Sequence, residues 1–178
     1  MESARLRHIY SKLQKFLGGP REVYLVQSIE AQTLLACEED AVIGRYDAST
    51  SRFGCGIREG SFKTPPGIHR IKEKIGAGAP AGRIFKDRID TGMDCDQGQA
   101  GDNLVLTRIL RLEGLEEGIN KGGGVDSWER CIYIHGTNRE GLVGTPLSHG
   151  CIALRNEDII RLFEIGRASC RERVYSGV

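Results

Sequence analysis

The chain lacks several features that would place it in a familiar class. Its 178 residues carry 25 lysines and arginines against 24 aspartates and glutamates, so it has no basic excess of the kind that binds nucleic acid. No apolar run approaches the roughly 20 residues of a membrane-spanning helix, and the N-terminus has no apolar stretch of about 7–15 residues typical of a signal peptide. None of the six cysteines belongs to a Cys-x-x-Cys pair, which argues against a zinc ribbon or a thioredoxin-like motif.

The remaining pattern fits one β-rich domain. A chain of 178 residues with 28% charged side chains is long enough for a single globular core. Runs rich in β-branched and aromatic residues predict strands over 23–29, 33–37, 41–46, 68–71, 103–112 and 131–134. Apolar residues at helical spacing predict an amphipathic helix over 1–19, and Asn156 is a candidate N-cap for a second helix. We expect a mainly β fold with a few helices.

The run Ser148–Cys151, with His135 sixteen residues before its end, is the clearest chemical signal. A free thiol is mostly protonated near neutral pH, so a nucleophilic cysteine needs a base within hydrogen-bond reach. His135 ends one predicted strand and Cys151 precedes another short apolar piece, so two neighbouring strands could bring them together. Gly150 permits a tight turn in which backbone N–H groups point toward a developing oxyanion. We expect Cys151 to be a nucleophile and His135 its general base.

These residues resemble the signature of the L,D-transpeptidase catalytic domain, the YkuD-type cysteine enzymes of bacterial cell walls. The similar segments are Ile132–Asn138, Ser148–Ile152 and Thr64–Gly67, the last being similar to the family's Thr-Pro-x-Gly segment. The resemblance implies an L,D-transpeptidase-like β-sandwich catalytic domain. Here that domain would span 20–163, truncated at its C-terminal helix and preceded by the helix over 1–19.

The resemblance also implies a reaction. Cys151 would attack a peptidoglycan tetrapeptide stem at the L-centre of residue three and release D-Ala. The acyl group would then pass to an amine of a neighbouring stem, which gives a 3→3 cross-link. Water as acceptor would make the chain an L,D-carboxypeptidase instead, and loss of activity would leave a non-catalytic peptidoglycan-binding module. The family is acylated by carbapenems, and no cofactor is implied.

Supporting residues follow from the same resemblance. The carbonyl near Gly136 would orient the ring of His135. The oxyanion site and its support would involve Gly150, His149, Ser148 and Gly136. Apart from the resemblance, Arg155, Tyr133 and His69 are candidate substrate contacts; the alternatives are a surface salt bridge for Arg155 and core or sheet-face positions for the other two. Where the family often has Arg or Asn two residues after the nucleophile, this chain has Ala153, so Arg155 is a candidate substitute.

Three points stay open from the sequence. His135, His149 and Cys151 are also potential zinc ligands, although no carboxylate base is obvious beside them and no metal is expected. The family implies the cell envelope, whereas the missing signal peptide leaves a cytoplasmic location open. Residues 164–178 look like the translation of a common sequencing adaptor, so we expect a non-native tail in which Cys170 has no function. The oligomeric state is not predicted.

Overall fold

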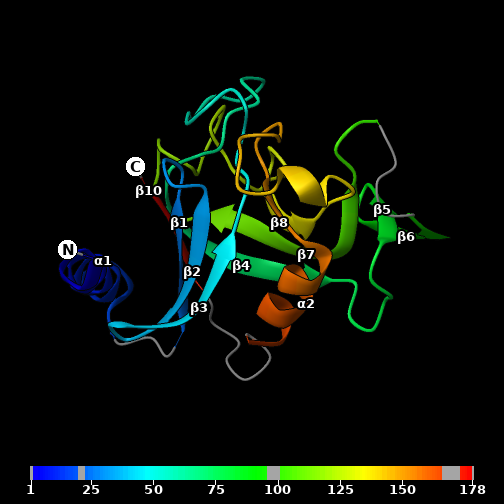
Figure 1. Cartoon of the computed structure of the whole chain (residues 1–178). Helices are drawn as coiled ribbons and strands as arrows, with labels where there is room; N and C mark the ends of the chain where they lie inside the picture. Colours follow the sequence, from blue (N-terminus) through cyan, green and yellow to red (C-terminus); the bar gives the residue numbers. More distant parts are fainter. Residues whose placement is uncertain (1, 20–22, 96–100, 166–172, 178) are drawn as a thin grey trace.

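The computed structural model describes residues 2–19, 23–95, 101–165 and 173–177, and within them it is mainly β (Figure 1). The helices are α1 (Glu2–Leu17) and α2 (Asn156–Ile165), with a 3-10 turn η1 (Glu140–Leu142). The strands are β1 (Tyr24–Ser28), β2 (Thr33–Glu38), β3 (Ala41–Asp47), β4 (Gly67–Ile75), β5 (Arg83–Lys86), β6 (Ile89–Asp94), β7 (Val105–Gly114), β8 (Tyr133–Gly136), β9 (Ile152–Leu154) and β10 (Arg173–Gly177). The predicted fold class is confirmed.

All ten strands belong to one hydrogen-bonded sheet. Its order is β3-β2-β1-β10-β4-β7-β5-β6, while β8 pairs with β7 and β9 pairs with β8. Buried side chains from β1, β2 and β3 share one core with those of β7, β8, β9 and α2. The sheet therefore curls so that its two halves enclose common apolar side chains, as the layers of a sandwich do.

Helix α1 covers the outer face of the β1–β3 end of the sheet (Figure 1). Its buried residues Leu6, Ile9 and Leu13 recur at the helical spacing that the sequence shows, and they pack in one cluster with Tyr24 and Val26. Burial of each aliphatic side chain contributes about 1.5–3 kcal/mol. In the described ranges, neither helix is long and apolar enough to cross a membrane.

Part of the expected non-native tail lies inside the sheet. Strand β10 pairs in parallel with β1 and antiparallel with β4, and Val174 is fully buried in the main core. Residues 166–172, including Cys170, lie outside the described residues. A position in the sheet does not bear on where these residues came from, so the non-native origin of the tail stays a prediction.

The strand predicted over 131–134 is displaced by two residues, to β8. Cys131 adopts a left-handed φ of +55°, and the Ile132 N–H donates to the Ser127 carbonyl rather than to a strand partner. This turn delays the start of the strand.

The hairpin of β5 and β6 was not predicted, because its turn residues Asp87 and Arg88 adopt positive φ without a glycine to signal it.

Candidate active site

Strands β8 and β9 place His135 and Cys151 on the same face of the sheet. The strands are parallel, with Ile134 opposite Ile152 and His135 opposite Ala153. Ile134 and Ile152 point into the main core. Because side chains alternate along a strand and neighbours across strands share a face, His135 leaves from the other side of this pair. Cys151 packs beside Tyr133 on that same side.

The backbone fixes the tautomer of His135. The ring is buried, and its Nδ1 lies 2.7 Å from the Gly136 carbonyl oxygen, the contact that the family resemblance implies. A carbonyl only accepts, so Nδ1 carries the proton and Nε2 keeps its lone pair in the neutral ring. Burial lowers the pKa of His135 to about 4, although the Gly136 contact opposes this shift. His135 is therefore a neutral ring with an acceptor nitrogen near pH 7.

Asn156 holds the backbone that follows His135. Its Nδ2 donates to the Thr137 carbonyl at 3.1 Å, and its Oδ1 accepts from the Thr107 hydroxyl at 2.5 Å. A Cβ at Gly136 would overlap the side-chain oxygen of Asn156, so glycine is required there. The sequence indicated only a helix cap at Asn156. Its buried side chain also joins β7 to the loop after the candidate base.

The surroundings of Cys151 favour the protonated thiol over the thiolate. Burial raises the pKa of Cys151 to about 11, a shift to which neighbouring Cys131 adds and which the backbone N–H of Tyr133 and the charge of Arg130 oppose. The Cys151 Sγ donates to the Cys131 carbonyl at 3.4 Å. Burial thus favours the uncharged forms of both side chains, a thiol at Cys151 and an imidazole at His135.

Ser148 closes the turn that carries Cys151, the candidate nucleophile. It is fully buried, its hydroxyl donates to the Cys151 carbonyl at 2.5 Å, and it accepts the Gly150 N–H at 3.2 Å. Gly150 has a φ of +126°, and a Cβ there would lie 3.2 Å from Ile132. These contacts make Ser148 a support of the turn and explain the glycine that precedes Cys151.

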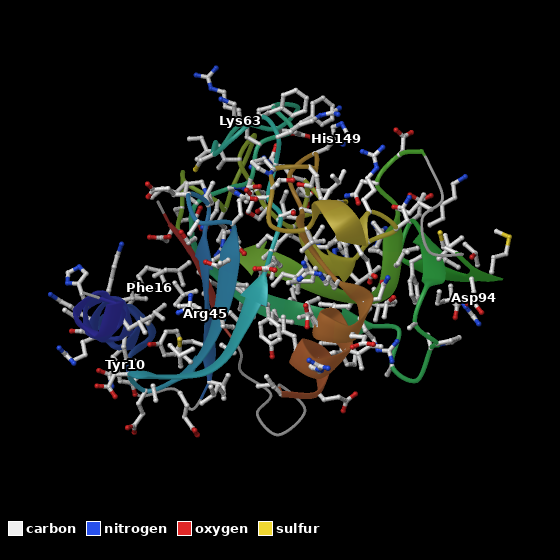
Figure 2. All side chains as sticks on the ribbon, viewed as in Figure 1. Tyr10, Phe16, Arg45, Lys63, Asp94 and His149 are labelled. Atoms are coloured by element: carbon white, nitrogen blue, oxygen red, sulfur yellow. The ribbon has the colours of Figure 1, made fainter. Side chains whose placement is uncertain are left out.

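His149 lies at the surface (Figure 2), whereas His135 is buried. Arg52 donates to His149 Nε2 at 2.6 Å. The rings of Phe53 and Phe62 each lie 5.8 Å from the imidazole. The contacts of His149 therefore brace the turn against residues 52–62.

The three candidate substrate contacts occupy different environments. Tyr133 is buried and its hydroxyl accepts from Arg88 at 3.0 Å, while its backbone N–H contacts the Cys151 thiol. His69 is fully buried, with Nδ1 3.2 Å from the Gly67 oxygen and Nε2 2.9 Å from the Ser127 hydroxyl. Arg155 pairs with Asp47 at 2.8 Å on the surface. Tyr133 thus adjoins Cys151, whereas His69 and Arg155 have protein partners elsewhere.

Arg130 is part of the site and was not predicted. Its guanidinium donates to the carbonyls of Gly56, Ile57 and Lys63, at 3.4, 2.9 and 2.5 Å. Its charge also opposes, in part, the upward shift in the pKa of Cys151 that burial causes. Arg130 lies in a stretch without periodic pattern, so only its place next to Cys131 and the His135 strand could have suggested a role.

No three His, Cys, Asp or Glu side chains within the described ranges are grouped so that they could hold a metal ion. In particular, the buried ring of His135 and the Arg52-bound ring of His149 serve different partners.

Known proteins with similar segments and folds share one description. Over 35 residues the chain is 57% identical to the probable L,D-transpeptidase YbiS of Escherichia coli K12 and 49% identical to the putative L,D-transpeptidase YqjB of Bacillus subtilis. Each match covers 20% of this chain, and they cover 11% and 20% of the two relatives. The chain therefore matches only a small part of these proteins.

Solved structures agree in fold. L,D-transpeptidase 3 from Mycobacterium tuberculosis, in complex with a faropenem-derived adduct, has a TM-score of 0.53 at 18% identity, covering 90% of this chain and 61% of that one. The L,D-transpeptidase LdtMt1 in complex with imipenem has a TM-score of 0.51 at 18% identity, covering 88% and 59%. The family model for the YkuD L,D-transpeptidase catalytic domain matches residues 22–170, and with that match across most of its length the chain belongs to the YkuD family of L,D-transpeptidase catalytic domains.

Proposed function

We propose that this chain is a peptidoglycan L,D-transpeptidase with Cys151 as nucleophile and His135 as general base. The observation that carries the proposal is the shared face of β8 and β9, on which the half-buried thiol of Cys151 lies one strand away from the buried imidazole of His135. The Gly136 carbonyl holds the ring with Nε2 as its acceptor. The family match and the transpeptidase folds support this choice of chemistry.

The first half of the reaction forms an acyl-enzyme. The Cys151 Sγ bonds to the carbonyl carbon at the L-centre of stem residue three while His135 Nε2 takes the thiol proton. The tetrahedral intermediate then collapses, the bond to D-Ala breaks, and His135 returns the proton to the leaving amine. Because burial raises the thiol pKa to about 11 and lowers the imidazole pKa to about 4, the proton rests on the sulfur before the substrate arrives.

The second half transfers the acyl group. An amine of a neighbouring stem attacks the thioester and gives its proton to His135, which passes it to the departing Cys151 sulfur. The product is a 3→3 cross-link. The oxyanion would be held by the Cys151 N–H, since the Gly150 N–H already donates to Ser148 and His149 is engaged by Arg52.

The donor and acceptor stems are the proposed partners, and the cell envelope is the proposed location, because the family acts on peptidoglycan. Since a solved relative holds imipenem, we propose that imipenem also acylates Cys151. Water as acceptor would make the enzyme an L,D-carboxypeptidase, which uses the same acyl-enzyme.

Incubation with a disaccharide-tetrapeptide, followed by mass spectrometry of protein and products, tests the proposal. We expect release of D-Ala by the wild type and by Cys95→Ala, a matched control in which a cysteine near the end of β6 is replaced. Cys151→Ala and His135→Ala should release none. Cross-linked dimers indicate transpeptidation and tripeptide alone indicates carboxypeptidation. Binding of the tetrapeptide without any turnover would contradict catalysis and favour a peptidoglycan-binding module.

A further inference from the structure

A short loop beside the nucleophile exposes an unusual amount of apolar surface. Three of the ten large apolar side chains exposed in the described part of the chain fall within residues 52–63: Phe53 at 46%, Ile57 at 36% and Phe62 at 56%. We call residues 52–63 the aromatic loop. A contiguous apolar patch on a soluble domain marks a binding surface more often than an isolated exposed residue does.

Hydrogen bonds fix the backbone of the aromatic loop. The Arg52 N–H donates to the Ser148 carbonyl at 3.1 Å, and the Gly56 N–H donates to the Thr64 carbonyl at 3.0 Å. Arg130 adds its contacts to three carbonyls of this region. The rings of Phe53 and Phe62 lie 6.2 Å apart. A partner would therefore meet a surface that is already ordered, which reduces the entropy lost on binding.

The aromatic loop borders the turn of the nucleophile. A Cβ at Gly150 would lie 3.5 Å from the Lys63 carbonyl oxygen and 3.9 Å from the Phe62 carbonyl carbon. His149 lies against both phenylalanine rings, and Figure 2 shows Lys63 and His149 at the same edge of the molecule. A chain joined to Cys151 would need to extend only a short way to reach this surface.

The charge of the aromatic loop selects for an acidic partner. Its sequence holds Arg52, Arg58 and Lys63 against one acid, Glu59. The guanidinium of Arg52 also lies 5.1 Å from the Phe53 ring. Cations around an apolar centre attract carboxylates and steer their approach, in a salt-dependent way.

We propose that the aromatic loop is a docking surface for an acidic peptide, namely the stem that acylates Cys151. The rings of Phe53 and Phe62 pack on the apolar body of the peptide, and Arg52, Arg58 and Lys63 face its carboxylates. The identity of this occupant rests on the proposed function. A neutral glycan would use the rings but not the cations, so charge distinguishes the two.

The test replaces the rings and leaves the catalytic pair intact. In the double variant Phe53→Ser/Phe62→Ser, we expect KM for the disaccharide-tetrapeptide to rise about tenfold or more, as on truncation of interface anchors. The rate of Cys151 alkylation by iodoacetamide reports whether the turn is intact, and it should stay within about twofold of wild type because Ser148 still closes the turn. Phe16→Ser is the matched control, since Phe16 is 47% exposed and lies on α1 (Figure 2).

Direct binding separates this proposal from the catalytic one. In a Cys151→Ala background, titration calorimetry with the tetrapeptide stem should show binding that weakens about tenfold in the double serine variant and falls with added NaCl. This holds even if the wild type releases no D-Ala. Equal binding by the double serine and Phe16→Ser proteins would overturn the proposal, as would absence of any binding. So would unchanged affinity for a stem whose carboxylates are amidated, because the partner would then be recognised without its charge.

Discussion

Ala153 lies directly opposite His135 in the parallel pair of β8 and β9. Ala153 is fully buried, and its backbone exchanges two 2.8 Å hydrogen bonds with Ser49. The residue type that the family often has here, arginine, would place its charge beside a buried neutral imidazole. A small, uncharged side chain at Ala153 is therefore compatible with the uncharged imidazole of His135.

Ala153→Arg introduces a residue type that the family often has at this position. We predict that it nevertheless destabilises this protein. A buried charge without a partner costs several kcal/mol, so the free energy of unfolding in urea should fall by at least about 2 kcal/mol. Ala153→Ser is the control, because its smaller polar group should cost about 1 kcal/mol. An Ala153→Arg protein as stable as the wild type would show that the site has room and a counter-charge for the guanidinium.

We predict that the reactivity of Cys151 rises steadily with pH. Only the thiolate is nucleophilic, and the pKa of Cys151 is raised to about 11. Alkylation by iodoacetamide, followed on the peptide that contains Cys151, should therefore rise about tenfold per pH unit from pH 6 to pH 9 without a plateau. A rate that stays flat between pH 6 and pH 8 would instead indicate a thiolate–imidazolium pair in the resting enzyme.

We predict a loss of stability in mild acid from the two buried histidines. Burial lowers the pKa of both His69 and His135 to about 4, so the unfolded chain binds their protons first as the pH falls below about 6.5. Their contribution is complete above pH 6.5 and is lost between pH 6.5 and pH 4. Each should cost about 2 kcal/mol between pH 7 and pH 5.

Urea denaturation at the two pH values measures this loss. His69→Gln keeps a polar side chain but removes one titrating group, so its decrease in stability from pH 7 to pH 5 should be smaller than that of the wild type. His8→Gln on α1 provides the control, since His8 is exposed. Equal decreases in the wild type and His69→Gln would mean that His69 accepts a proton in the folded state.

We predict that Asn156 positions His135 and does more than cap a helix. Asn156→Ala leaves the Thr107 hydroxyl and the Thr137 carbonyl without this partner, which should cost about 1–3 kcal/mol. The rate of Cys151 acylation by imipenem should fall more than in Arg155→Ala, where an exposed ion pair with Asp47 is lost at a cost of about 0–1 kcal/mol. Acylation that is equally fast in both variants would limit Asn156 to stability.

Local patterns in the sequence determined much of the fold. The β-branched runs indicated β1, β2, β3 and β7 within a few residues of their observed ends, and the helical spacing in 1–19 marked the buried face of α1. The Ser148–Cys151 run with His135 upstream pointed to the candidate catalytic pair. These features depend on residues close together in the chain, where steric and hydrogen-bonding preferences act directly.

Only the tertiary structure decided the partners of the other candidate residues, and so which of them lie near that pair. It buried His69 against Ser127, paired Arg155 with Asp47 and turned His149 toward Arg52. It also brought Arg130 to the aromatic loop. Each of these contacts joins segments that are 58 to 108 residues apart in the sequence. No periodic sequence pattern predicts a contact between residues so far apart. They exist because the curled sheet brings those segments together and burial then selects the partners.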